Sequence, residues 1–410
     1  MSESRTPGVE QLIQTIQKDI YNHPESVLRP LRHLLRQADS DALLLYAYAH
    51  LGFAHLLLGE HRMSKIFCEH ALSLRADAQV LSNLAHAVWE LGEKAPAVEH
   101  GRRALGLKDE AAVAGGKTDL GKPYLGEKNL ISFSLYGNKA RYCETAVLNC
   151  VAAKQHLPGF VCRFYVDQSV PADVIARLRD HSAEIVAIQG RAASFFPTFW
   201  RFLAIDEKDA DRVLVRDADS LIDAREGHCV REWVESGKPF HIIRDHCGHT
   251  ELIHAGLFAA RAGVVDQVEE RIATYIATAG NLGFDRTSDQ LFLGKCVWPV
   301  VREHALTHDS VYGYGADVRP IPSDIADRPG PRNSFIGANY ANYLLQLATQ
   351  ESLAEGGLYF LRIIGEEGKT VCEYPMDLVS VGRRELQIFL PQSYAKLLES
   401  GTWRCEIFRK

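Results

Sequence analysis

The stretch that decides the fold is Arg212-Val-Leu-Val-Arg-Asp-Ala-Asp-Ser220, a short apolar run that ends in two aspartates. Its apolar centre predicts a buried β-strand. Alternate residues of an extended segment point the same way, so Asp217 and Asp219 can face one cation. Mn²⁺ and Mg²⁺ prefer such oxygen ligands and bridge carboxylates to phosphate oxygens. The alternative is a pair of aspartates that caps a turn.

Upstream of this stretch, apolar strands alternate with helical patterns. The predicted strands cover residues 129–137, 160–166, 184–188 and 212–216, and the predicted helices cover about 139–156, a segment from about 171, and a segment that begins with 199–203. This alternation predicts an α/β domain with a mostly parallel sheet. Ligands of such sheets bind beyond the carboxyl ends of the strands, here the loops after residues 134, 166 and 216.

Several common nucleotide and hydrolase motifs are missing from the sequence. It contains no GxxxxGK[ST] loop, no GxGxxG after the first strand and no GxSxG elbow. Phosphate groups would therefore be bound by a metal ion and by side chains. The pattern disfavours a dinucleotide-dependent dehydrogenase and a serine hydrolase.

The N-terminal part of the chain repeats with an offset of 33 residues. Leu58-Gly59-Glu60 recurs as Leu91-Gly92-Glu93, and Ala71-Leu-x-Leu74 recurs as Ala104-Leu-x-Leu107. This pattern resembles the tetratricopeptide repeat (TPR), whose period is about 34 residues. The resemblance implies a protein partner or self-association through this region, or a bracing role. The alternative is a plain helical bundle.

The chain is predicted to contain four regions. They are a helical TPR-like domain over 1–110, a Gly- and Lys-rich linker over 111–128, the α/β domain over 129–350 and a small β-rich region over 351–410. The strands predicted in the last region cover 358–364, 370–373, 385–389 and 403–408.

Composition excludes some classes of protein. The formal net charge of −6 disfavours a nucleic-acid binder. The nine cysteines are odd in number and irregularly spaced, which favours reduced thiols. The sequence shows neither a signal peptide nor an apolar transmembrane segment. We therefore expect a cytoplasmic location, with peripheral attachment at the inner membrane as an open alternative.

The run Trp200-Arg-Phe-Leu-Ala204, followed by 211–220, resembles bacterial glycosyltransferases of the GT-A fold, in particular the capsule and exopolysaccharide group. Further pieces occur in the order typical of that family. They are Gly237–Asp245, Ala255–Phe258, Ser288–Leu293, His308–Ser310 and Phe335–Gly337. Together the pieces cover about 129–340, roughly half of the chain.

The resemblance implies how a nucleoside-diphosphate sugar would be bound. Asp217 and Asp219 would hold a Mn²⁺ or Mg²⁺ ion and the donor diphosphate. The other implied donor-binding residues are Ser134, Tyr136, Arg141, Arg201 and Gly256.

The resemblance also implies the catalytic groups. Asp245 and Asp289 resemble carboxylates near the reaction centre, and either is the candidate general base if the anomeric centre inverts. His308 is the expected third metal ligand. In the related family 8 retaining enzymes a histidine precedes the segment similar to 335–337, but here that position is Ser334. The sequence therefore leaves retention and inversion open.

The function implied is metal-dependent transfer of a sugar to a carbohydrate acceptor in surface polysaccharide synthesis. The alternative is a non-catalytic TPR scaffold with a degenerate transferase domain. The segment Arg244-Asp-His-Cys-Gly-His249 carries zinc-ligand residue types, but its Cys-x-His spacing is not a recognised structural zinc pattern. For this segment we favour an acceptor-site loop over a zinc site.

Overall fold

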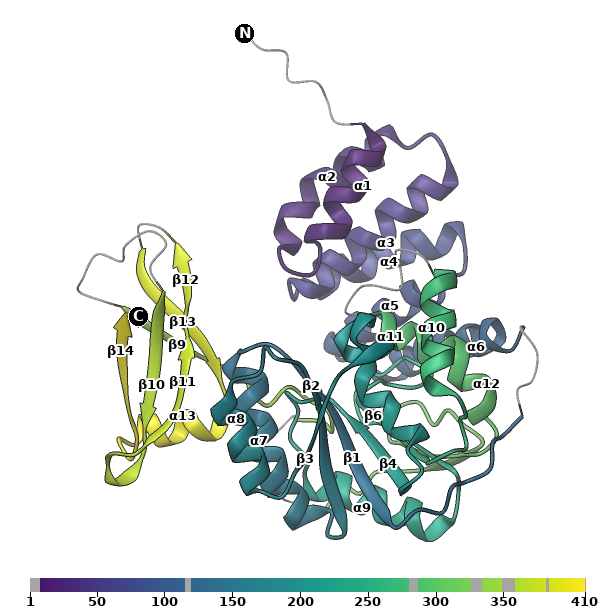
Figure 1. Ribbon diagram of the computed structural model, residues 1–410. Coiled ribbons are helices and arrows are strands. Elements are labelled where there is room, and N and C mark those ends of the chain that lie inside the picture. Colours follow the sequence, from purple (N-terminus) through teal and green to yellow (C-terminus); the bar gives the residue numbers. More distant parts are fainter. Residues whose placement is uncertain are drawn as a thin grey trace. The chain divides into compact units, whose positions relative to one another are not determined.

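The structure is a computed structural model that describes residues 8–114, 119–279, 287–325, 334–348, 358–380 and 383–409 (Figure 1). The chain forms two compact units. The first comprises Met1–Lys117, Arg244–Leu252 and Asp309–Arg319, and the second comprises Thr118–Ile243, Ile253–His308 and Pro320–Lys410. Residues 115–118 of the predicted linker and 349–357, where the C-terminal region was predicted to begin, lie outside the described residues.

The first unit is mainly helical. Its helices are α1 (Val9–Asp19), α2 (Pro24–Gln37), α3 (Asp41–Leu57), α4 (His61–Leu74), α5 (Ala78–Glu90) and α6 (Lys94–Val113), and it also holds the short strand β8 (Asp317–Arg319). Helix α6 extends into the range predicted as linker. Across the described residues, no helix combines the length and the apolar character needed to cross a membrane.

The two Leu-Gly-Glu stretches form equivalent turns between helices. Gly59 and Gly92 both adopt left-handed backbone conformations, with φ of 72° and 86°. In each turn the following glutamate N–H donates to a carbonyl five residues back, from Glu60 to His55 at 2.9 Å and from Glu93 to Val88 at 3.1 Å. Glycine is favoured at such a helix end because it lacks a Cβ atom.

Two later segments of the chain pack onto α5 and α6 within the first unit. The Lys108 ammonium of α6 donates to the Thr250 carbonyl at 3.0 Å and pairs with the Glu251 carboxylate at 2.6 Å. The Tyr312 hydroxyl donates to the Cys247 carbonyl. Gly101 makes room for that tyrosine, since a Cβ atom there would lie 2.0 Å from its ring. These contacts fix the backbone of 244–252 within the unit.

A large mixed sheet, mostly parallel in its first half, forms the centre of the second unit. Its strands are β1 (Lys128–Leu135), β2 (Phe160–Val166), β3 (Glu184–Ala187), β4 (Ala210–Arg216), β5 (Phe240–Arg244), β6 (Leu257–Arg261) and β7 (Ala305–Asp309). Their order is β3-β2-β1-β4-β6-β5-β7. The first four strands are parallel, and β6 runs antiparallel to both β4 and β5. The four strands predicted upstream of Asp217 are confirmed to within about two residues.

Helices connect these strands. They are α7 (Ala140–His156), α8 (Ala172–Asp180), α9 (Ala224–Ser236), α10 (Val268–Ala279), α11 (Ser288–Phe292) and α12 (Trp298–Val301), with 3₁₀ helices at Gly190–Ser194 and Pro197–Asp206 and a π-helical turn at Leu293–Val297. The segment predicted to start a helix at Phe199 is thus a 3₁₀ helix that begins at a proline. Apolar side chains on both faces of β1 and β2 are buried, including the stacked pair Phe133 and Phe164, whose ring centroids lie 4.8 Å apart.

The C-terminal part adds two small sheets and a helix to the second unit. Its elements are β9 (Tyr343–Ala348), β10 (Tyr359–Ile364), β11 (Thr370–Pro375), β12 (Asp377–Ser380), β13 (Arg383–Leu390), α13 (Gln392–Glu399) and β14 (Arg404–Arg409), together with a 3₁₀ turn at Glu366–Gly368. The sheets have the orders β11-β10-β14 and β12-β13-β9. All four predicted strands are present.

A buried carboxylate joins this C-terminal part to the α/β core. Glu144 of α7 is fully buried and accepts hydrogen bonds from Arg177 of α8 at 2.6 and 2.9 Å. The hydroxyl groups of Tyr374 and Tyr394 donate to the same carboxylate at 2.5 and 2.6 Å. Three cationic or hydroxyl partners therefore compensate for the lost hydration of this one carboxylate.

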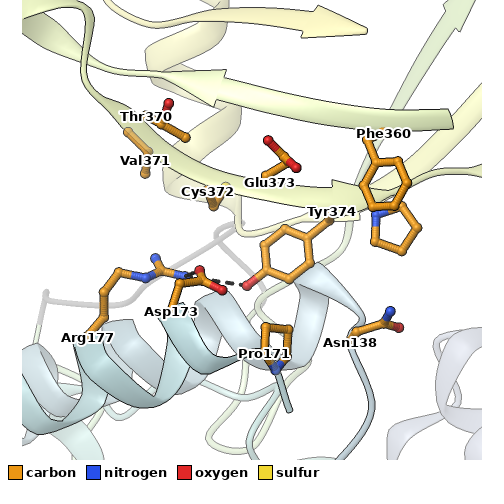
Figure 2. Close-up of a pocket in the computed structure, with 11 residues that line it drawn as sticks. Asn138, Pro171, Asp173, Arg177, Phe360, Thr370, Val371, Cys372, Glu373 and Tyr374 are labelled. Atoms are coloured by element: carbon orange, nitrogen blue, oxygen red, sulfur yellow. Dashed lines mark hydrogen bonds and ion pairs between the residues drawn. The ribbon is translucent and has the colours of Figure 1, made fainter. Parts of the chain in front are cut away.

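A cavity of about 510 Å³ lies beside this network, between α8 and strands β10 and β11. Figure 2 shows the ring of Tyr374 directed towards Asp173 and Arg177, below the strand that carries Cys372 and Glu373. The cavity is lined by both the α/β core and the C-terminal part. Two of its lining residues, Asn138 and Pro171, lie in the loops after β1 and β2, but neither aspartate of the motif after β4 lines it.

Candidate active site

Three adjacent strands bring predicted residues to one edge of the sheet. In the parallel pairing of β1 with β4, Phe133 lies opposite Arg216, so Ser134, near the end of β1, and Asp217, directly after β4, lie at the same edge of the sheet. In the antiparallel pairing of β4 with β6, Arg216 lies opposite Leu257, which places Gly256 beside Asp217. This edge is where ligands of such sheets bind.

Arg201 connects two of the predicted carboxylates. Its guanidinium is buried and pairs with Asp217 through Nη1 and with Asp289 through Nη2, the latter at 2.8 Å. Nη1 also donates to the Arg216 carbonyl at 3.2 Å. The Asp289 side chain is 5% exposed, whereas Asp217 is 45% exposed. The arrangement therefore keeps the Asp289 carboxylate inside the protein and leaves the Asp217 carboxylate accessible to a ligand.

The backbone of Arg201 is fixed by two serines of β1. The Ser132 hydroxyl donates to the Arg201 carbonyl at 2.7 Å, and the Ser134 hydroxyl accepts from the Arg201 N–H at 3.0 Å. Ser134 was predicted to contact the nucleotide, and in the structure it positions Arg201. Ser132 was not predicted, although its spacing of two residues from Ser134 puts both side chains on the same face of the strand.

Asp219 lies in the turn after β4, beyond Asp217. Its carboxylate pairs with Arg141 of α7 at 3.2 Å, and its carbonyl accepts from the Tyr340 N–H at 2.8 Å. The turn is also held by Asn149, whose side chain donates to the Ser220 carbonyl at 2.9 Å. Asn149 and Tyr340 are distant from the Asp-Ala-Asp motif in the sequence, and no motif marked them.

The charges around the motif affect its two carboxylates differently. Burial favours a raised pKa for Asp217, but the guanidinium groups of Arg201 and Arg216 outweigh burial and lower it. Burial and the neighbouring charge of Asp217 raise the pKa of Asp219, against the opposing effect of Arg141. The two carboxylates thus lie close enough for each to influence the ionisation of the other.

Gln290 is a further residue of this site that the sequence reasoning did not assign. Its side-chain oxygen accepts from the Ala255 N–H at 3.0 Å, and its amide nitrogen donates to the Ile253 carbonyl. These bonds fix the segment that leads into Gly256. Gln290 could have been identified from the sequence, because it follows Asp289 within Ser288–Leu293, one of the segments that resemble the glycosyltransferases.

We predict that Gly256→Ala disturbs Asp217 directly. A Cβ atom at Gly256 would lie 2.0 Å from Asp217 Oδ2 and 3.1 Å from the Asp217 nitrogen, so the carboxylate has to move. The Mn²⁺ affinity that the sequence predicts for Asp217, measured by calorimetry, should fall by about 10- to 100-fold, as it does when groups that orient a metal ligand are removed. Gly294→Ala is the matched control, since a Cβ atom there meets nothing within 4 Å. Equal Mn²⁺ affinity in both variants would contradict the prediction.

The aromatic residues near Arg201 pack mainly in the core. Phe199, Trp200 and Phe202 are buried. Tyr136 is 36% exposed and meets Trp200 edge to face, with ring centroids 6.0 Å apart. Tyr136 therefore lies at the carboxyl end of β1 with part of its ring accessible.

The structure does not bring His308 together with the two aspartates. Its Nε2 lies 2.7 Å from Glu232 Oε2 and its Nδ1 lies 2.7 Å from His241 Nε2, so both ring nitrogens are engaged. Among the described residues, Asp217, Asp219 and His308 do not form a cluster with metal-binding spacing. His308, near the end of β7, therefore serves as a buried hydrogen-bonding group.

Asp245 falls in the segment 244–252 of the first unit, whereas Asp217, Asp219 and Asp289 belong to the second unit. Within the first unit the Asp245 N–H donates to His249 Nδ1 at 3.0 Å. The carboxylate that the structure joins to the motif is therefore Asp289.

Comparisons with known proteins give distant structural similarity. No protein-family model matches the chain, and no curated protein sequence matches it. Among solved structures, a variant of an O-GlcNAc transferase from Thermobaculum terrenum aligns with a TM-score of 0.26 at 14% identity, over 44% of this chain and 41% of its own. A mannosyltransferase from Pyrobaculum calidifontis, solved with GDP-Man and Mn²⁺, aligns with a TM-score of 0.30 at 12% identity, over 60% of this chain and 70% of its own. This chain thus matches less than half the length of the first of these proteins.

Proposed function

We propose that the chain is a GT-A-type glycosyltransferase that moves a sugar from a nucleoside-diphosphate donor to a carbohydrate hydroxyl with the help of Mn²⁺ or Mg²⁺. Synthesis of a surface polysaccharide is the setting we infer for it. The observation that carries the proposal is the meeting of Ser134, Asp217 and Gly256 at one sheet edge, with Arg201 joining Asp217 to Asp289.

The side chains at this edge suit a hard divalent cation. Asp217 and Asp219 offer carboxylate oxygens, which are the ligands that Mn²⁺ and Mg²⁺ prefer. Asp217 is 45% exposed, so a phosphate-bound ion can reach it from solvent. When bound, such an ion would neutralise charge on the leaving diphosphate.

We assign a separate role to each residue around the proposed metal and donor site. Arg201 keeps Asp217 oriented, and Arg141 does the same for Asp219. Gly256 leaves room for the Asp217 carboxylate, because a Cβ atom there would collide with it. Asp289 is the carboxylate best supported near the reaction centre, and Asp245 stays a second candidate in the first unit. We further propose that the TPR-like helices bind a protein partner or a second copy of the chain.

The test is donor- and metal-dependent stabilisation of the full-length protein in a thermal-unfolding assay with UDP- and GDP-sugars. A ligand present at about 100 times its dissociation constant stabilises the folded state by about 2.7 kcal/mol. We expect a rise of several degrees in Tm for the cognate donor with Mn²⁺, and a much smaller rise with either component alone.

Asp219→Asn is the matched control for this assay, because it keeps the size of the side chain and removes the charge. The rise in Tm should disappear in this variant. Stabilisation by no donor, or by a donor equally well with and without metal, would contradict the proposed function and favour a non-catalytic binding protein.

A further inference from the structure

A second cluster of metal-ligating side chains lies in the first unit, where no motif predicted one. His86 and Glu90 come from α5, and His246 and Cys247 come from the segment 244–252. The ligand atoms of all four residues lie within 4.8 Å of one another. The segments that supply them are far apart in the sequence, which explains why the spacing around Cys247 did not suggest a zinc site.

The distances within the cluster fit one tetrahedral ion. The Cys247 sulfur lies 3.7 Å from His246 Nε2, 3.9 Å from its Nδ1 and 4.0 Å from Glu90 Oε1. The rings of His86 and His246 meet edge to face, with centroids 5.5 Å apart. Zinc bonds of about 2.0–2.3 Å in a tetrahedron separate neighbouring ligand atoms by about 3.3–3.8 Å. Side-chain adjustments of about an ångström would therefore bring the four ligand atoms to that spacing.

The backbone around the cluster is fixed from both sides. His86 and Glu90 are four residues apart on one helix, so they share a face. On the other side, Tyr312 binds the Cys247 carbonyl and Lys108 binds the carbonyl of Thr250. The Gly248 N–H donates to His246 Nδ1 at 3.0 Å, and binding of an ion through Nδ1 would take over that lone pair.

Gly248 also keeps space open at the cluster. A Cβ atom at this position would lie 3.1 Å from His246 Nδ1 and 3.7 Å from His86 Nδ1. Cys247 is buried, the two histidines are half-buried and Glu90 is exposed. An ion can therefore enter past the exposed Glu90 side chain and reach the sulfur of Cys247, which is buried from solvent.

We propose that His86, Glu90, His246 and Cys247 bind a divalent transition-metal ion of the zinc type, which ties the segment 244–252 to α5. A thiolate and two imidazoles select a softer ion than the carboxylates Asp217 and Asp219 do. The bond closes a long loop of the chain, so it stabilises the fold of the first unit by restricting its unfolded state.

The test uses full-length protein loaded with Zn²⁺ alone, with affinity measured by chelator competition. The wild type should bind zinc with high affinity, and its Co²⁺-substituted form should show a thiolate-to-cobalt charge-transfer band. Cys247→Ser should remove that band and weaken zinc binding at least about 100-fold, since even the residues that orient ligands contribute 10- to 100-fold. Glu90→Gln, at an exposed position, should weaken binding without affecting folding.

Two controls separate this site from others. His70→Gln changes an exposed histidine of α4 outside the cluster and should keep wild-type zinc affinity. Asp219→Asn should also keep it, although the same variant is expected to lose donor binding. A wild type that retains no zinc, or a Cys247→Ser variant that binds Zn²⁺ as tightly as the wild type does, would overturn the proposal.

Discussion

Asp217→Asn and Asp219→Ala are each expected to lower kcat for sugar transfer by at least about 10²–10³-fold, with the fold intact. Removing one group that stabilises charge in a transition state costs about this much. Asp217 is 45% exposed and Asp219 lies in a turn, so neither change opens a buried cavity. The measurement is release of nucleoside diphosphate at saturating donor and Mn²⁺, with circular dichroism to verify folding.

Asp180→Asn is the matched control, since it removes a carboxylate from the exposed end of α8. It should retain wild-type kcat. Full activity in the Asp217 or Asp219 variant would exclude a role for the motif in metal binding, whatever the donor proves to be.

Glu144→Ala is expected to lower the free energy of unfolding of the second unit by about 3–5 kcal/mol. The substitution leaves the Arg177 guanidinium without its buried partner and removes the acceptor of two tyrosine hydroxyls, Tyr374 and Tyr394. Hydrogen exchange of α7, α8 and β11 measures the loss within this unit without requiring the whole chain to unfold in one step.

Two comparisons test the cause of this loss. Glu399→Ala, at an exposed position of α13, should change stability by no more than about 0.5 kcal/mol. Tyr394→Phe removes one hydroxyl donor and should cost about 1–2 kcal/mol. If Glu144→Ala were no more destabilising than Glu399→Ala, the buried network would contribute nothing to joining the C-terminal part to the core.

The sheet and its helices were largely predictable because their signals are local. Apolar runs such as Phe160–Val166 and the repeated Leu-Gly-Glu turns carry enough information in a few residues to fix strands and helix ends. The antiparallel placement of β6 beside β4 was not predicted. It depends on pairing between segments about 40 residues apart, which no local pattern specifies.

Residues of the candidate site that directly follow a strand could be predicted from the sequence. Residues whose hydrogen-bond partners come from distant parts of the sequence could not. Asp217 could be placed at the end of β4 from the sequence, but the serine pair that fixes Arg201 depends on how β1 packs against the 3₁₀ helix. The prediction that His308 is a metal ligand depends on its residue type and its late position in the domain. Its neighbours His241 and Glu232, which engage both of its ring nitrogens, are a product of tertiary packing.

The hydrogen bonds of Glu144 also constrain when the protein can complete its folding during synthesis on the ribosome. Its tyrosine partners lie 230 and 250 residues further along the chain. A ribosome that adds about 5–20 residues per second needs on the order of ten seconds or more to reach Tyr394 after Glu144. During that time a nascent α7 carries a carboxylate that lacks two of its native donors. The first unit is also completed late, because residues 244–252 and Tyr312 pack against its helices, so both units gain their full set of contacts only after much of the chain has been synthesised.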